Sequence, residues 1–100
     1  MIVLRFKVRC QPDKTASVAD AMQDVVTASR SLPGVMHFDV GTDVTDANTL
    51  IATEVFEDAA ARERQESLSE VAKVMSLLPD ALAGPPEATV FHVASTEAAM

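Results

Sequence analysis

Hydrophobic residues in this chain follow two different periods, and the order in which the periods alternate constrains the fold more than any other feature. From Met1 to Arg9, apolar and polar residues alternate, which is the period of a half-buried strand. Strand-like segments return over Val35 to Val44, Thr49 to Phe56 and Ala88 to Ala94. The sequence therefore predicts four strands.

Two segments between these strands have helical spacing instead. In the first, inward-facing residues recur three and four positions apart from Val18 to Ser29, and Pro33-Gly34 ends the helix. Helical sequence resumes at Ala59, with a break expected around Ser67 or Ser69. The inward stripe predicted for this second segment is Leu68, Val71, Val74, Met75 and Leu78. The residues expected to prevent it from continuing are Pro79, Gly84, Pro85 and Pro86.

The predicted order is strand, helix, strand, strand, helix, strand. In one domain this order indicates an α+β fold of the ferredoxin-like βαββαβ type, with a four-stranded antiparallel sheet and both helices on one face. One hundred residues, 48% of them hydrophobic, suit one such domain. We assign residues 1–94 to it and expect 95–100 to form a flexible C-terminal tail.

The sheet face away from the helices is expected to be partly apolar. The residues placed there are Val3, Val35 and either Ile51 or Val55, with Arg5, Lys7, Arg9, His37 and Asp39 as possible charge partners. A small monomer rarely leaves such a surface in water, so the pattern favours pairing with a second sheet. The alternative is a solvated, mixed-charge face on a monomer.

Charge and cysteine content exclude several classes of function. The net charge of −7 and the pI of about 4.6 argue against nucleic acid as a partner. Cys10 is the single cysteine, so no intramolecular disulfide can form. No basic, then apolar, leader opens the chain, and no apolar run approaches a membrane span. We expect a cytoplasmic protein with no membrane association.

Three segments together resemble the antibiotic biosynthesis monooxygenase family. They are RSLPGVMHFDV (Arg30 to Val40), EVFEDAAA (Glu54 to Ala61) and LAGPPEATVFHV (Leu82 to Val93). The resemblance covers residues 1 to about 94. It implies a dimeric α+β barrel, in which two ferredoxin-like sheets of a homodimer pack face to face. Each protomer would keep a ligand cavity between its sheet and its helices.

The resemblance also implies a chemistry. Enzymatic members oxidise quinols, hydroxyanthrones and related electron-rich rings with molecular oxygen, without metal, flavin or haem. The protein then supplies a dry pocket, a proton acceptor and stabilisation of the ring anion. This predicts a cofactor-independent monooxygenase acting on a small quinol or polyketide-like aromatic. The alternative is a non-catalytic dimeric module that binds a small hydrophobic ligand.

The chain departs from the family pattern at four positions. Phe56 stands where many members have tryptophan, Gln65 and Glu70 stand where they have histidine, and Val71 stands where phenylalanine is common. These differences weaken a direct transfer of catalytic roles. Haem degradation is disfavoured because the second helical segment has no histidine to ligate iron.

Three residues are candidate proton acceptors. His37 and His92 are candidates because imidazole is the side chain best suited to accept a proton at physiological pH, and His92 is favoured because it lies near the end where the pocket should close. A structural or interface role stays open for either histidine. Glu54 shares a strand side with Phe56, so a helix-facing position would desolvate it and make it a base. The alternative for Glu54 is an ion pair with Arg5 or Arg64.

The remaining candidates are expected to bind the substrate. Those expected at the cavity are Phe6, Met22, Phe38, Phe56, Arg64, Val71 and Met75. Arg64 would attract an anionic substrate at the mouth, or would belong to a solvated helix face. The acidic residues Glu57, Asp58, Glu63, Glu66 and Glu70 are interpreted as the wet side of the second helix. Neither histidine has a ligand partner at zinc-site spacing, so no metal site is predicted.

Overall fold

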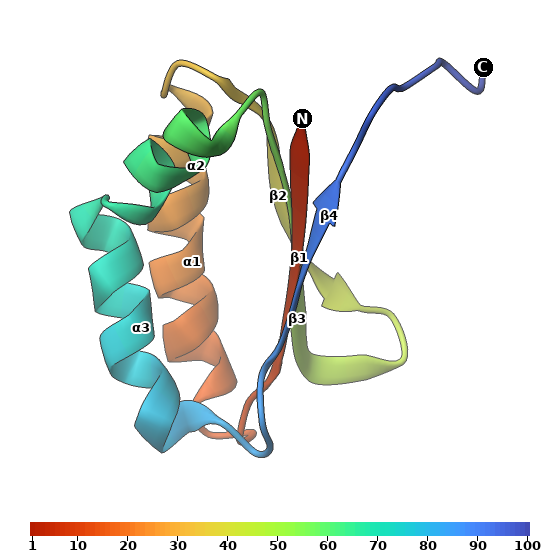
Figure 1. The fold of residues 1–100 in the computed structure, drawn as a ribbon. Helices are drawn as coiled ribbons and strands as arrows, with labels where there is room; N and C mark the ends of the chain where they lie inside the picture. The colour runs from red at the N-terminus through yellow and green to blue at the C-terminus, as the bar shows by residue number, and fades with distance from the viewer.

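Four strands and three helices make up the computed structural model, which describes residues 1–100 (Figure 1). In chain order they are β1 (Ile2–Arg9), α1 (Thr15–Arg30), β2 (Val35–Asp43), β3 (Asp46–Phe56), α2 (Ala59–Glu66), α3 (Ser69–Ala81) and β4 (Glu87–His92). The strands form one antiparallel sheet in the order β2-β3-β1-β4, and all three helices lie on one face. The predicted ferredoxin-like α+β fold is confirmed.

The strand register separates a helix-facing side from a bare side. In β1, Phe6 pairs with Ala52 of β3, and Val8 pairs with Leu50. Val8 and Leu50 are buried in the main hydrophobic core beneath the helices. Alternation places Arg5 and its odd-numbered neighbours on the opposite side, as the sequence predicts.

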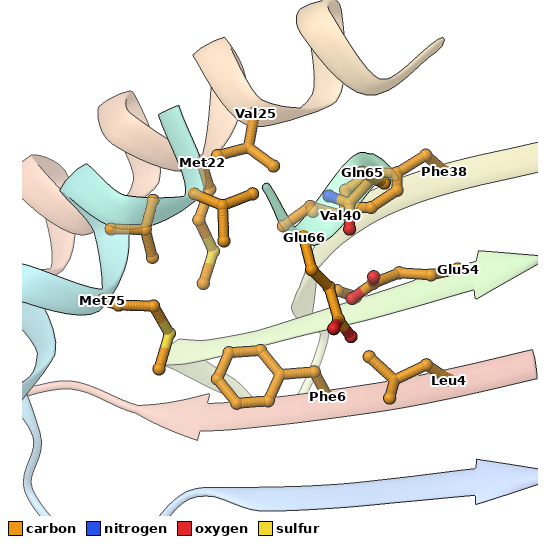
Figure 2. Close-up of a pocket in the computed structure, with 13 residues that line it drawn as sticks. Leu4, Phe6, Met22, Val25, Phe38, Val40, Glu54, Gln65, Glu66 and Met75 are labelled. Carbon is orange, nitrogen blue, oxygen red and sulfur yellow. The ribbon is translucent and has the colours of Figure 1, made fainter. Parts of the chain in front are cut away.

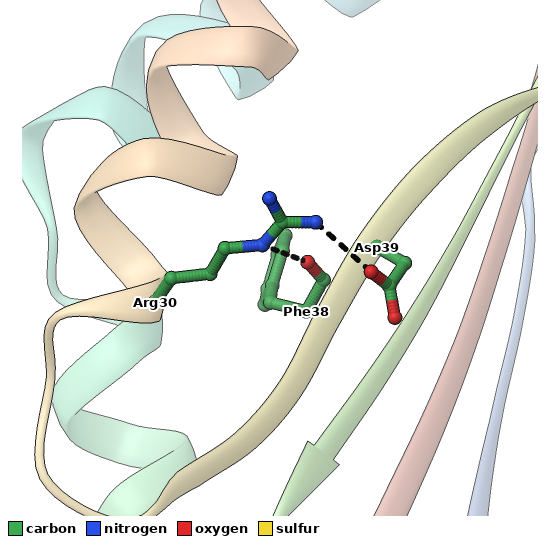
Figure 3. A network of polar contacts seen from close by, with 3 residues as sticks. All are labelled: Arg30, Phe38 and Asp39. Carbon is green, nitrogen blue, oxygen red and sulfur yellow. Dashed lines mark hydrogen bonds and ion pairs between the residues drawn. The ribbon is translucent and has the colours of Figure 1, made fainter.

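Helix α1 is joined to the edge strand β2 by Arg30, its last residue. The guanidinium donates through Nε to the carbonyl oxygen of Phe38 and through Nη2 to Oδ1 of Asp39, each at 2.9 Å (Figure 3). Both side chains of the ion pair are largely exposed, so it contributes at most about 1 kcal/mol to stability. Asp39 is thus paired with Arg30, and the expected pairing with Arg5, Lys7 or Arg9 within the chain is wrong.

The second helical segment is two helices, as the predicted break implies. Asp58 caps α2 by accepting a hydrogen bond from the backbone N–H of Ala61 at 2.9 Å. Pro79, however, lies inside α3 and does not stop it. A proline this close to the C-terminus removes only one backbone hydrogen bond, while the buried Leu78 and Ala81 hold the last turn against α1 and the core.

Two strand details differ from expectation. A β-bulge between Val35 and His37 inserts one extra residue into β2, because Val35 pairs with Phe56 and His37 pairs with Val55. Val35 therefore turns to the helix side and packs against the core, and its expected place on the bare face is wrong. The turn between β2 and β3 is only Val44-Thr45, because Asp43 Oδ1 accepts hydrogen bonds from the backbone N–H and hydroxyl of Thr45.

The C-terminal end of the chain leaves the body of the fold. Strand β4 ends at His92, two residues before the predicted end, and residues 93–100 form neither helix nor strand. This segment extends away from the sheet in Figure 1. None of the three helices combines the length and apolar character needed to span a bilayer.

Gly34 supplies a test of the connection between α1 and β2. Its φ of +84° is in the left-handed region, and an added Cβ would lie 2.6 Å from Cβ of Ala61. Gly34→Ala should therefore lower the free energy of unfolding by about 2 to 4 kcal/mol, measured by urea denaturation.

Gly41→Ala is the matched control for this substitution. Nothing lies within 4 Å of a Cβ added at Gly41, and its φ is not positive. This variant should change the free energy of unfolding by less than about 1 kcal/mol, and in the stabilising direction. Equal effects of the two substitutions would show that the clash with Ala61 is absent.

Candidate functional site

A cavity of about 340 Å³ lies between the helices and the helix-facing side of the sheet (Figure 2). This volume is at the small end of the range of about 300–1,000 Å³ that is typical of ligand sites. Thirteen residues line it, ten of them hydrophobic: Leu4, Phe6, Met22, Val25, Phe38, Val40, Ala52, Glu54, Gln65, Glu66, Val71, Val74 and Met75. The site is therefore an apolar space with three polar side chains.

The cavity exists because the third helix does not fill the space above the sheet. Helix α3 packs chiefly against α1 and lies farther from the strands in Figure 1. On the sheet below, the small side chain of Ala52 sits between Phe6 of β1 and Val40 of β2. Met75 of α3 points inward and lines the cavity, as the inward stripe implies, but it is 55% exposed because no side chain of the sheet packs over it.

Glu54 is the buried carboxyl group of this site. It lies on β3 between Leu4 of β1 and Phe38 of β2, and it is only 6% exposed. Burial, and to a smaller extent the nearby charge of Glu66, raise the pKa of the Glu54 carboxyl to about 7, although Arg62 opposes the rise. The carboxyl therefore changes its protonation state near neutral pH.

Glu54 differs from the other buried polar residues in having no partner. Gln65 Nε2 donates to Oγ of Ser29 at 3.0 Å, and the hydroxyl of Thr49 donates to Oδ2 of Asp46 at 2.8 Å. Glu54 makes no hydrogen bond and no ion pair, and its oxygens face the cavity in Figure 2. The carboxyl oxygens of this buried residue open onto the cavity and have no protein partner, so they are available to a ligand.

The expected ion pairs of Glu54 are absent for geometric reasons. Arg5 pairs with Thr53 in the register, which places it on the bare face of the sheet. Arg64 donates through Nη1 to the carbonyl oxygen of Pro33 at 2.6 Å. Arg64 also does not line the cavity, so its expected place at the mouth is wrong.

The structure brings most of the predicted site residues together. Five of the seven predicted binding residues line the cavity with Glu54: Phe6, Met22, Phe38, Val71 and Met75. Phe56 does not line it, because it is fully buried in a separate cluster with Ile2 and Ala61. Strand alternation correctly predicts that Phe56 points to the helix side, but Ala61 of α2 packs against it and fills the space there.

The two histidines lie outside this cavity. His92 pairs with Ile2 at the end of β4 and lines a separate, open depression with residues of the α2 N-terminus. His37 is exposed and pairs with Val55 on the bare face. The described chain brings no three His, Cys, Asp or Glu side chains into an arrangement that could hold a metal ion.

Sequence reasoning missed two polar lining residues. Gln65 and Glu66 both line the cavity, and the interpretation of Glu66 as part of the wet helix face is wrong in that respect. The sequence signal that could have identified Gln65 is its spacing of four from Ala61, which places both residues on the inner face of α2. The apolar lining residues that were not singled out are Leu4, Val25, Val40, Ala52 and Val74.

Comparisons with known proteins identify relatives of the chain in sequence. A sequence model of the family described as antibiotic biosynthesis monooxygenase matches residues 1–75. An uncharacterized protein of Synechocystis is 27% identical over 96 residues, which are 96% of this chain and 65% of that protein. The chain thus spans about 65% of the length of this relative.

Solved structures show the same fold at low sequence identity. An antibiotic biosynthesis monooxygenase-like protein of Nitrosomonas europaea is 18% identical with a TM-score of 0.86, over 95% of this chain and 100% of that chain. A second such protein, from Deinococcus radiodurans, is 15% identical with a TM-score of 0.87, over 100% and 99% of the two chains. With the family match over residues 1–75, these findings establish that the chain belongs to the antibiotic biosynthesis monooxygenase family.

Proposed function

We propose that this protein is a cofactor-independent monooxygenase that oxidises a small quinol or polyketide-like aromatic with molecular oxygen. The observation that carries the proposal is the unpartnered carboxyl of Glu54, which faces an apolar cavity. In this proposal, Glu54 is the proton acceptor, and the apolar lining binds the ring and excludes water. His92 has no part in it, because it lies outside the cavity.

The chemistry requires no reductant besides the substrate. Glu54 takes the hydroxyl proton of the quinol, and the resulting ring anion passes one electron to oxygen. The two radicals then combine through a new carbon–oxygen bond, and the hydroperoxide breaks its O–O bond to leave one oxygen atom on the ring and release the other as water. For a naphthohydroquinone, the quinol and one O₂ become a hydroxynaphthoquinone and one H₂O, so the four electrons come from the ring.

Two further features of the cavity support this assignment. The pKa of Glu54 near 7 suits a base that must accept a proton near neutral pH and release it again. Gln65 uses one amide hydrogen on Ser29, which leaves its second hydrogen for a ligand oxygen. The buried bond to Ser29 also fixes the position of the Gln65 amide, because both residues are almost fully buried.

The bare sheet face supports a homodimer. One row across the sheet consists of Val55, Val3 and Phe91, and Phe91 is 49% exposed. The β2–β3 hairpin and the C-terminal segment project on this side of the sheet in Figure 1. A second copy packed on this face would cover the apolar row, and dimers are typical of the family.

One observation favours the second candidate function, a non-catalytic module that binds a small hydrophobic ligand. No Lys, Arg or His side chain lines the cavity. A ring anion formed there would be stabilised only by the amide of Gln65 and by any charge acting from outside. A binding module has no such requirement, and it predicts ligand binding without oxygen uptake.

Oxygen uptake tests the catalytic role of Glu54. With a panel of naphthohydroquinones and anthrones in metal-free buffer, the wild-type rate should rise as the pH increases through about 7, because the base must be deprotonated. Glu54→Gln should lower kcat by about a hundredfold or more. Glu63→Gln, an exposed substitution on α2, is the control and should retain the rate. Rates equal to the uncatalysed background for every substrate would leave only the binding module.

The stability of Glu54→Gln should depend on pH differently from that of the wild type. The pKa of Glu54 is raised from 4.5 to about 7 in the folded protein, so the carboxyl loses its proton at a lower pH in the unfolded chain than in the folded one. Wild-type stability should therefore fall by about 3 kcal/mol as the pH rises from about 4.5 to about 7, and then level off. Urea denaturation across this range should show the fall in the wild type and not in the variant. Parallel curves would mean that Glu54 is not desolvated.

The dimer has a direct test. Light scattering at micromolar protein concentration should give about twice the chain mass of 10.6 kDa. Val3→Glu and Phe91→Glu, which place carboxylates in the apolar row, should shift the mass toward that of one chain. A wild-type mass of one chain would contradict the dimer without affecting the Glu54 assignment.

A further inference from the structure

The mouth of the cavity carries a second carboxylate. Glu66 is the last residue of α2, and its carboxylate points toward Glu54 and toward Leu4 and Phe6 on the sheet (Figure 2). Its Oε1 accepts a hydrogen bond from Nε of Arg62, one helical turn earlier, at 2.7 Å. The Glu66 side chain is 46% exposed, so it is in contact with both the cavity and the solvent.

The charges that act on Glu54 come from this part of α2 alone. Glu66 and Arg62 are the two charged residues that influence it, and they act in opposite directions. Apart from Glu54 itself, the side chains that the other elements present to the cavity are uncharged: Leu4 and Phe6 from β1, Met22 and Val25 from α1, Phe38 and Val40 from β2, Ala52 from β3, and Val71, Val74 and Met75 from α3. Charge at the cavity thus comes from Glu54 and from the end of α2, and Arg62 is the one cation that acts on Glu54.

We propose that Glu66, held in place by Arg62, determines the charge of the ligand: it admits an uncharged hydroxy-aromatic molecule and rejects an anionic one. The proposal deepens the function proposed above and rests on the same cavity. Glu66 is therefore a specificity-determining residue, while Glu54 remains the group that receives the proton.

Electrostatics in an apolar space explains this selection. An anionic ligand would lose its hydration on entry and would meet Glu54 and Glu66 with no cation among the lining residues. The net charge of −7 opposes the same ligand at longer range. An uncharged ring with a hydroxyl group avoids this repulsion and can donate its hydrogen bond to the unpartnered Glu54 carboxyl.

Arg62 limits the repulsion without cancelling it. Its guanidinium is bonded to Glu66 through Nε and does not line the cavity. Removal of Arg62 should therefore leave Glu66 uncompensated and increase the rejection of anions, whereas removal of the Glu66 charge should decrease it. Loss of packing alone would not move the two variants in opposite directions.

The test compares three probes with the same ring system: naphthol, naphthalenesulfonate and the naphthylmethylammonium ion. Binding to the full chain is measured by calorimetry in slightly acidic, low-salt buffer, where naphthol is uncharged and the sulfonate is not. The wild type should bind naphthol at least about tenfold more tightly than the sulfonate, which is a difference of about 1.4 kcal/mol.

Three variants isolate the charge at position 66. Glu66→Gln should reduce the naphthol-to-sulfonate ratio by about threefold or more, and Arg62→Gln should increase it. Glu63→Gln removes the same charge from an exposed site on the same helix and should leave the ratio unchanged. The pKa of Glu54, followed by carbon NMR of the side-chain carboxyl, should fall in Glu66→Gln and rise in Arg62→Gln. Urea denaturation of each variant verifies that it is folded.

Several results would overturn the proposal. They are equal wild-type affinities for naphthol and the sulfonate, identical effects of the Glu66 and Glu63 substitutions, and tightest binding of the ammonium ion, which would mark a cation site. Absence of binding by every probe would overturn the ligand cavity itself. Oxygen uptake is not part of this measurement. Charge selection without turnover would therefore reject only the monooxygenase, and turnover without charge selection would reject only the role of Glu66.

Discussion

Because α3 packs chiefly against α1, the helical layer leaves part of the sheet uncovered above β1 and β3. Ala52 lies on the sheet side of this space, and its small side chain leaves room above the strand. The surrounding side chains are too far apart to fill that room. The buried core continues beside the cavity through Val8, Leu50 and Leu78. Helix α3 therefore borders the packed hydrophobic core at one part of its length and the ligand cavity at another.

This space makes Glu54 unlike the other buried polar groups. Gln65 and Ser29 satisfy each other and join α2 to α1, so they contribute to structure. Glu54 is also buried but has no partner, so its proton is held until the pH nears 7. The protein retains this destabilising burial at the one position where a buried carboxyl group faces the cavity, which is the arrangement expected of a functional group.

Sequence patterns predicted elements and faces well, but they failed where the backbone or packing departs from a simple period. The bulge at Met36 reverses the side on which Val35 lies, and alternation cannot detect an extra residue. Pro79 continues a helix because buried neighbours compensate for its missing N–H. Phe56 and His92 lie on the predicted strands but outside the cavity. Phe56 is packed against α2, and His92 lines a separate, open depression.

The residues at the mouth show the same limit. The acidic pattern of α2 correctly predicts an exposed face, yet Glu66 lies where the helix ends and turns toward the cavity. The effect of Glu66 on the pKa of Glu54 depends on how far α2 lies from β3. Only two residues link these two elements, but the two glutamates that interact are not neighbours in the sequence. A pattern within one element contains no information about that distance.

The sequence by itself determined the order of strands and helices, the shared strand side of Glu54 and Phe56, and the apolar character of most residues expected at the cavity. These properties follow from local periods, because alternation and helical spacing assign each residue to a face. Only the tertiary structure decided that a cavity remains there, that Glu54 has no partner and that Glu66 stands at its mouth. Those outcomes depend on how far α3 lies from the sheet, which is set by packing among residues distant in the chain.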